Sequence, residues 1–398
     1  MKNRELIIKT LALILFGILF SFIVWCGNGG NGGNGTSGGD DGSGDNGETG
    51  EIIYNSDHAP KFVAVGSGDK AAYSDDGISW SSEKMPAMPK NANWYSVCYG
   101  DGKFVAVGNG PNNSATDKAA YFKNGKWTET PLKTSAKWYS VCYGNGKFVA
   151  VAGKPSSKAA YSDDGINWNS ADMPSSENWV SVCYGGGMFL AVSTGGDKAA
   201  YSTNGTNWTQ ASMPASGNWR SVCYGNGKFV AVSFGIINAG SYRMAAYSTN
   251  GTNWTLAAYN IVAGWESVCY GNSKFVIVSS STGSLRLFAS TTVKSNRVAY
   301  SSYEIIQASF MPALTCLLLS NISSGSITGS LAYSTDGNNW TAKSMPYVAD
   351  WSSVCYGDGK FVAVGENVCA YSTDGITWSK GPILSDNVDL YSVCCSGD

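Results

Sequence analysis

The stretch WYSVCYGDGKFVAVG, residues 94–108, returns almost unchanged as WYSVCYGNGKFVAVA at 138–152 and as WRSVCYGNGKFVAVS at 219–233. Each copy contains two runs rich in Val, Tyr, Phe and Ala, which are typical of buried strands. A Gly-Asp-Gly or Gly-Asn-Gly spacer separates the two runs and favours a tight hairpin. The stretch therefore predicts a pair of antiparallel strands that recurs along the chain.

Two further recurring sequence motifs complete the repeated unit. AAYS or a close variant predicts a third strand, and Ser-x-Asp/Asn-Gly-x-x-Trp follows it as a turn leading into a fourth strand. Short polar side chains bond the backbone of such a turn, Gly accepts a positive φ, and Trp packs back on the hairpin. The tryptophans that begin successive units lie 40 to 46 residues apart between Trp94 and Trp265, which is the period of a four-stranded β-propeller blade. The turn word occupies residues 74–80, 162–168, 202–208, 248–254, 334–340 and 372–378.

The expected number of blades depends on the region between Trp265 and Trp351, in which the repeat motifs are only partly recognisable. These two tryptophans are 86 residues apart. This distance equals two periods, and a Met-Pro pair at residues 311–312 stands near its expected place. The run ALTCLLL at 313–319 stands where the first two strands of an extra blade would lie. We therefore expect an all-β propeller of eight blades, with seven blades and a long insertion as the alternative.

The two ends of the chain predict how the ring closes. The first blade begins on FVAV at residues 62–65 without the preceding strand word, whereas the chain ends on YSVCC at 391–395. The C-terminal strand should therefore pair into the N-terminal blade, which leaves the circle without an open edge.

The turn word resembles the Asp-box of BNR-repeat propellers, the superfamily that contains sialidases, sortilin-type receptors and photosystem assembly factors. The match covers nearly all of residues 61–398, although this turn lacks one residue between Asp and Gly. The resemblance implies a structural turn. A sialidase would also need converging arginines, a Tyr–Glu nucleophile pair and an acidic catalyst. The Arg-Ile-Pro stretch typical of sialidases is absent, so a sialidase-like hydrolase is the minor alternative.

The N-terminal segments predict export and attachment. Residues 1–26 combine a basic start with an uncharged run and read as a signal. They resemble a bacterial lipoprotein signal in which Cys26 becomes lipidated, but Trp25 stands where a small residue is usual, so an uncleaved signal anchor is the alternative. Residues 27–51 are rich in Gly, Asn and Asp and predict a flexible tether, and residues 52–398 form the propeller. We expect the body to lie outside the cytoplasm, in the cell envelope or on the surface, anchored to the membrane.

The net charge and the cysteine content limit which partners, disulfides and metal or cofactor sites are expected. The formal net charge is −2, and without a strong basic field nucleic acid is not expected as a partner. Eight of the eleven cysteines occupy one strand position in different units, which predicts buried, unbridged thiols. A bridge from Cys369 to Cys394 or Cys395 stays open. The chain has one His and no metal-binding spacing or cofactor motif, so we expect neither metal nor cofactor.

The repeat breaks in the connections from second to third strand and from blade to blade. Two neighbouring variable loops, 233–244 and 279–297, stand out, and all four arginines of the body lie in or beside them. Guanidinium groups with aromatic rings can hold an anionic or sugar ligand, whereas the structural alternative is that these loops are only solvated. The candidate ligand-binding residues are Arg220, Tyr242, Arg243, Arg286, Phe288 and Arg297.

These features together predict a non-catalytic, membrane-tethered binding module. Its ligand is expected to be a glycan or an anionic surface molecule, its partner an extracytoplasmic protein or glycan, and its own state a monomer. The alternatives are an assembly factor for an envelope complex, as the photosystem resemblance implies, and the hydrolase named above.

Overall fold

The computed structural model describes residues 60–81, 87–154, 156–234, 245–257, 261–262, 264–280, 286–287, 331–346, 348–384 and 389–396. Within these ranges the chain is all-β, apart from one 3-10 turn, η1 (Pro111–Asn113). None of their helices is long and apolar enough to cross a membrane. The signal, the tether and Cys26 lie outside the described residues.

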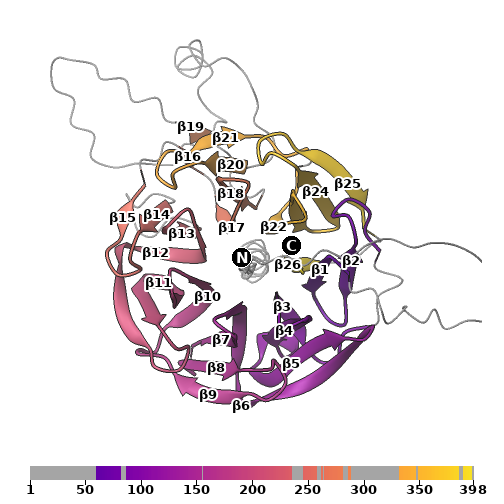
Figure 1. Ribbon diagram of the computed structural model, residues 1–398, viewed down its shortest axis with the longest axis vertical. Helices are drawn as coiled ribbons and strands as arrows, with labels where there is room; N and C mark the ends of the chain where they lie inside the picture. Colours follow the sequence, from indigo (N-terminus) through magenta and orange to yellow (C-terminus); the bar gives the residue numbers. More distant parts are fainter. Residues whose placement is uncertain are drawn as a thin grey trace, which may run out of the picture.

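The strands form antiparallel sheets arranged radially around a central axis, as Figure 1 shows. The first four blades, from the axis outward, contain these strands. Blade 1 has β26 (Leu390–Cys395), β1 (Phe62–Gly66) and β2 (Ala71–Ser74); blade 2 has β3 (Asn93–Gly100), β4 (Lys103–Asn109), β5 (Thr116–Lys123) and the first half of β6 (Lys126–Gly144). Blade 3 has the second half of β6, β7 (Lys147–Gly153), β8 (Lys158–Ser162) and β9 (Asn169–Asp172); blade 4 has β10 (Asn178–Gly185), β11 (Met188–Ser202) and the first half of β12 (Thr209–Gly225).

The remaining blades follow the same plan. Blade 5 has the second half of β12, β13 (Lys228–Ser233), β14 (Ala245–Ser248) and β15 (Thr255–Leu256), and blade 6 has β17 (Trp265–Gly271), β18 (Lys274–Ser279), β20 (Leu331–Ser334) and β21 (Thr341–Lys343). Blade 7 has β22 (Trp351–Gly357), β23 (Lys360–Gly365), β24 (Val368–Ser372) and β25 (Ser379–Ile383). A separate pair joins β16 (Ile261–Val262) to β19 (Arg286–Leu287).

The predicted closure is confirmed by the pairing of the first and last strands. β26 lies antiparallel to β1, with Phe62 opposite Cys395 and Val63 opposite Cys394. The backbone N–H of Ser396 adds a hydrogen bond of 2.7 Å to the Lys61 carbonyl. The last strand of the chain is thus the innermost strand of the first blade.

The described strands fall into seven blades, and the eighth blade that the sequence predicts is not found among them. β18 pairs directly with β20, so that Phe275 lies opposite Ser334. Blades 6 and 7 are neighbours, because the backbone N–H of Val354 donates to Ser267 Oγ at 3.0 Å. A blade between them would separate these atoms. The run at 313–319 lies outside the described residues.

One serine of each inner strand explains much of the repetition. Its hydroxyl oxygen accepts a hydrogen bond from a backbone N–H on the inner strand of the next blade. We call these serines the serine ring, because their bonds follow one another around the axis until they return to the first blade. The bonds run from Val97 to Ser392, Val141 to Ser96, Val182 to Ser140, Val222 to Ser181, Val268 to Ser221, Val354 to Ser267 and Val393 to Ser353, at 3.0–3.3 Å.

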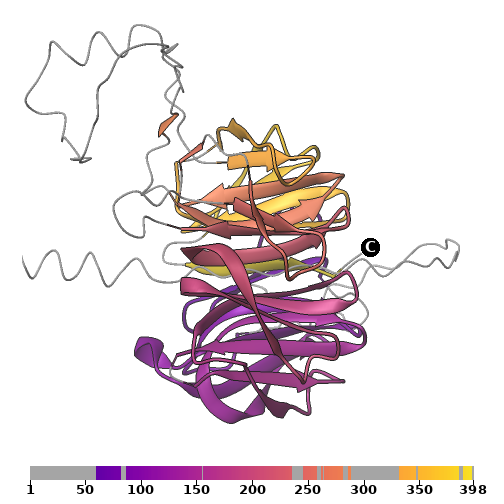
Figure 2. The ribbon, with the colours of Figure 1, turned by 90° about the vertical axis from the view of Figure 1, so that its left-hand side faces the viewer.

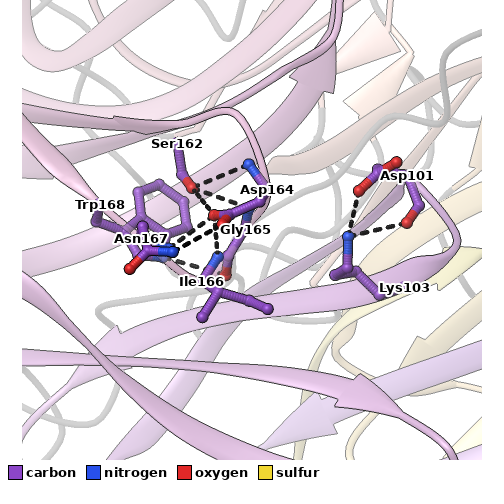
Figure 3. Close-up of polar contacts among 8 residues, drawn as sticks. All are labelled: Asp101, Lys103, Ser162, Asp164, Gly165, Ile166, Asn167 and Trp168. Carbon is purple, nitrogen blue, oxygen red and sulfur yellow. Dashed lines mark hydrogen bonds and ion pairs between the residues drawn. The ribbon is translucent and has the colours of Figure 1, made fainter.

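The Ser-x-Asp-Gly turns are structural, as Figure 3 shows for blade 3. Ser162 Oγ accepts from the N–H of Gly165 at 2.8 Å, and Asp164 Oδ1 accepts from the N–H groups of Ile166 and Asn167. Gly165 has φ +70°, and a Cβ there would lie 2.9 Å from a methyl group of Val105 in blade 2. These turns therefore hold their own backbone and pack on the preceding blade.

Candidate functional site near the axis of the variable face

The two faces of the disc, seen edge-on in Figure 2, are built differently. The tight hairpins between first and second strands and the turns between third and fourth strands lie at one face, which we call the hairpin face. Figure 3 includes one such hairpin, in which Lys103 donates to Asp101. The connections between second and third strands and between blades lie at the opposite, variable face. Binding residues concentrate on loops that vary over a rigid scaffold.

Each inner strand begins at the variable face with a β-bulge. The register shifts between the blade tryptophan and the serine-ring residue, as between Trp94 and Ser96 or Trp219 and Ser221. One residue is left unpaired there, and bulges commonly re-aim a side chain. We call these seven residues the mouth ring: Tyr391, Tyr95, Tyr139, Val180, Arg220, Glu266 and Ser352, in order from blade 1 to blade 7.

Blades 1 to 4 supply an apolar and aromatic half of the mouth ring. The rings of Tyr95 and Tyr391 are stacked with centroids 5.2 Å apart, and Tyr139 meets Tyr95 edge-on at 5.7 Å. Val180 packs in the same cluster. Side chains from four successive blades can touch one another only near the axis, so the bulges turn them toward the axis.

Blades 5 and 6 supply a buried pair of opposite charge. Arg220 Nε lies 3.9 Å from Glu266 Oε2, and both side chains are only 6% exposed. The Arg220 guanidinium also lies 5.2 Å from the ring of Phe234. Neither Arg220 Nε nor Glu266 Oε2 has a hydrogen-bond partner among the described residues. Burying charges with unmade hydrogen bonds costs stability, so packing alone does not account for this pair.

The surroundings of Glu266 bring its titration close to neutral pH. Burial raises the pKa of its carboxyl to about 7, with Arg220 lowering that pKa and Asp350 raising it. Burial likewise raises the pKa of Tyr139 to about 12, against hydrogen bonds and the Arg220 charge, which lower it. The tyrosines of the mouth therefore stay neutral, whereas Glu266 can change its charge.

Loops of the variable face surround the mouth ring. Asn109 hydrogen-bonds with both Tyr95 and Tyr139, and Asn113 of η1 also bonds Tyr139. Ser67, between β1 and β2, hydrogen-bonds with Tyr391. The mouth ring is thus joined to the variable connections, and a change in one can reach the other.

The predicted site residues are only partly placed by the structure. Arg220 belongs to the mouth ring and is buried, so it does not reach solvent as a loop arginine would. Arg286 lies in β19, where Val262 pairs with it. Tyr242, Arg243, Phe288 and Arg297 lie outside the described residues, and their gathering around one ligand stays a prediction. Sequence reasoning missed Glu266 as a partner of Arg220, although both stand between a constant tryptophan and a constant serine.

The described cysteines are buried, and no disulfide joins any two of them. The Cys369 thiol donates to the Pro382 carbonyl at 3.3 Å, and no disulfide joins Cys369 to Cys394 or Cys395. Cys316 lies outside the described residues. The described part of the chain contains no group of three or more His, Cys, Asp or Glu side chains that could hold a metal ion.

Comparison with known proteins supports the architecture alone. No protein-family model and no curated protein matches the sequence. The chain is similar in structure to streptogramin B lyase, with a TM-score of 0.55 and 10% identity over 76% of this chain and 86% of that one. The computationally designed Ika8 protein gives a TM-score of 0.50 and 8% identity over 84% and 90% of the two chains. YCF48 bound to D1 peptide gives 0.49 and 14% identity over 76% and 84%. At such identities the likeness shows only that this chain has a β-propeller fold.

Proposed function

We propose that this protein is a non-catalytic binding module, which holds its partner with the variable face around the mouth ring. The observation that carries the proposal is the variation within the mouth ring. Three Tyr, one Val, one Arg, one Glu and one Ser fill seven equivalent positions. The next residue along each strand is Ser in all seven blades.

The distribution of differences around the disc supports a role for this face. A repeat maintained only for folding would need the same neighbour contacts in every blade, and the hairpin face is built that way. At the variable face a buried Arg–Glu pair, a cluster of tyrosines and loops of unequal length replace the repeat. Scaffolds that bind through one face show this combination of constant core and diverse loops.

The ligand is proposed to be a glycan or an anionic surface molecule, presented by an extracytoplasmic protein or by the envelope itself. Arg243 and Arg286 are the residues proposed to contact it, since guanidinium groups make forked, charge-assisted hydrogen bonds to carboxylates, phosphates and sulfates. Arg220 is proposed to support the site from below, because its side chain is buried against Phe234 and Glu266.

The same proposal places the propeller outside the cytoplasm, tethered through lipidated Cys26 or through an uncleaved anchor. Exchange of Cys26 for Ser in the expressed full chain separates these two forms of attachment. A lipid anchor predicts that the variant leaves the membrane fraction or keeps its signal, whereas an uncleaved anchor predicts unchanged membrane attachment and length.

The decisive experiment is a binding screen of the detergent-solubilised full chain against arrayed neutral and acidic glycans. We expect retention on acidic glycans, and loss of at least about tenfold in affinity when Arg243 and Arg286 are both replaced by Ala. The matched control replaces Lys147 and Asp163 of the hairpin face, an exposed ion pair, and should bind like the wild type. Equal losses from both double variants would reject the variable face as the site. Release of free sugar from a sialoside would reject the non-catalytic assignment.

A further inference from the structure

One junction between blades differs from the others around the ring. At five other junctions the tyrosine that ends the inner-strand motif lies over a glycine of the preceding blade. A Cβ built on Gly100 would lie 2.1 Å from Tyr143 Cγ, and one on Gly271 would lie 2.0 Å from Tyr356 Cγ. Between blade 7 and blade 1 that place belongs to Cys395, whose Sγ would lie 2.3 Å from a Cβ on Gly357. The closing strand has therefore exchanged the tyrosine of the repeat for a thiol.

A second thiol lies opposite Cys395 at this junction. The N–H of Val393 donates to Ser353 Oγ at 3.2 Å. Both inner strands run in the same direction, so two residues further along each strand stand Cys355 and Cys395. The two thiols are near enough for Cys395 to raise the pKa of Cys355, and the Cys395 thiol donates to the Tyr356 carbonyl at 3.0 Å. At the preceding junction the residue in the place of Cys395 is Tyr356, opposite Cys269.

The burial of these thiols determines when they could react. Cys355 is 1% exposed and Cys395 is 2% exposed. Burial raises the pKa of the Cys355 thiol well above its usual value, and a thiol, unlike a thiolate, is a poor nucleophile. An oxidant therefore reaches the pair before or while β26 docks, and hardly at all afterwards.

We propose that Cys355 and Cys395 form a disulfide that fastens the closing strand to blade 7 when the chain folds in an oxidising compartment. The oxidant is a disulfide donor of low molecular mass or a disulfide-carrying protein. One cysteine thiolate attacks the donor disulfide and releases one thiol, and the second cysteine then attacks the mixed disulfide and releases the other. Two cysteine thiols are oxidised, and one donor disulfide is reduced to two thiols. The proposal is independent of any ligand of the variable face.

The link would act on the one strand that closes the ring. It joins residues 355 and 395, so it removes conformational freedom from a segment of about 40 residues in the unfolded chain, which typically stabilises the folded state. For a domain of this size the expected gain in melting temperature is roughly 5 °C. β26 is far from β1 in the sequence, so no tight turn joins it to the blade that it completes, and a covalent link to blade 7 would fix its position.

The test refolds the full chain from denaturant, once with oxidised glutathione and once with dithiothreitol. Free thiols are then blocked in denaturant and the digested protein is analysed by mass spectrometry. We expect two fewer free thiols after oxidative refolding, one peptide linked between Cys355 and Cys395, and a melting temperature higher by roughly 5 °C. Absence of the linked peptide, or a link that joins Cys369 to Cys394 or Cys395, would overturn the proposal.

Variants distinguish the pair from neighbouring thiols. Cys395→Ser should lose the linked peptide and the dependence of melting temperature on redox conditions, whereas Cys394→Ser should keep both. Cys142→Ser is the matched control, because Cys142 is equivalent to Cys355 in blade 3 but has Tyr184 in the place of Cys395. It should keep the link even if it melts earlier. If Cys395→Ser does not fold, the thiol count and the linked peptide of the unmodified chain still decide the question.

Discussion

Two neighbouring positions in every inner strand differ in how much they vary from blade to blade. The serine-ring position is Ser in all seven blades, whereas the mouth-ring position immediately before it is Tyr, Val, Arg, Glu or Ser. The two side chains are one residue apart in sequence and both lie close to the axis. Their surroundings differ, because the serine oxygen accepts a backbone N–H from the next blade, and the mouth-ring residue lies in a bulge.

The difference shows where the fold leaves freedom. A buried N–H without an acceptor is costly, so each blade needs the serine of the blade before it. A bulge residue has no partner in the ladder, and any side chain that fills the mouth satisfies the fold. Evolution can therefore place function in the mouth ring without disturbing the serine ring, and the following predictions test that separation.

The largest effect is expected from removing residues 391–398, which deletes one member of each ring together with β26. β1 would then present an unpaired edge, and the circle would open. We expect loss of cooperative unfolding, or a fall in melting temperature of more than about 10 °C, in calorimetry of the full chain and the truncated chain. Deletion of eight residues from the tether, 31–38, is the control. A truncated protein that melts like the full chain would reject closure as a source of stability.

The next largest effect concerns the charge in the mouth ring. The folded chain raises the pKa of Glu266 to about 7 from an ordinary value of 4.5, so the native state holds this proton more tightly than the unfolded state. The stability that this carboxyl contributes is complete below about pH 4.5 and is lost as pH rises through about 7, by about 3 kcal/mol. Glu266→Gln resembles the protonated carboxyl. The variant should equal the wild type near pH 4 and exceed it near pH 8.

Urea unfolding at the two pH values measures this difference. Glu129→Gln is the control, because Glu129 is a half-exposed carboxylate paired with Lys118 and should change little at either pH. If Glu266→Gln loses the same stability at both pH values, the carboxylate stabilises the mouth through Arg220, and the mouth-ring charge is structural.

The sequence alone predicted the four-stranded blade and the closure of the ring, because both depend on short sequence motifs. Val-rich runs, the Gly-Asn-Gly spacer and the Ser-x-Asp-Gly turn each act within a few residues, and YSVCC at 391–395 repeats the one word that the first blade lacks. The number of blades, in contrast, depends on pairing between strands that are far apart in the sequence. The 86 residues between Trp265 and Trp351 equal two periods, so a long stretch inside one blade has the same length as an extra blade. The direct pairing of Phe275 with Ser334 cannot be read from such lengths.

The candidate site shows the same limit. Arg220 stood out because it departs from the repeat, and the structure places it in the mouth ring. Its partner Glu266 lies 46 residues away in the next blade, and a carboxylate at a variable position carries no local sign of burial. The bulges that turn both side chains toward the axis depend on how the strands pair. The repeated sequence motifs do not specify that pairing in detail.

A smaller effect should separate the two rings within a single pair of residues. Ser352 belongs to the mouth ring and Ser353 to the serine ring, so the same exchange to Ala can be made at adjacent positions. Ser353→Ala leaves the N–H of Val393 without its acceptor and should cost about 1–3 kcal/mol in the free energy of unfolding. Ser352→Ala should cost less than about 0.5 kcal/mol. Chemical denaturation of both variants decides the matter, and equal costs would contradict the division into two rings.

The smallest effect on stability is expected beyond the mouth ring, in the loops that should contact a ligand. Replacing Arg243 and Arg286 by Ala leaves the backbone pairing of β19 with β16 available and removes no contact of the serine ring. The free energy of unfolding should therefore change by less than about 0.5 kcal/mol, as it should for the control pair Lys147→Ala and Asp163→Ala on the hairpin face. Binding should distinguish the two, since each charge-assisted contact is typically worth roughly 1.5–3 kcal/mol. A loop variant that unfolds more easily by several kcal/mol would mean that these arginines maintain the fold, and the freedom of the variable face would then be smaller than the mouth ring indicates.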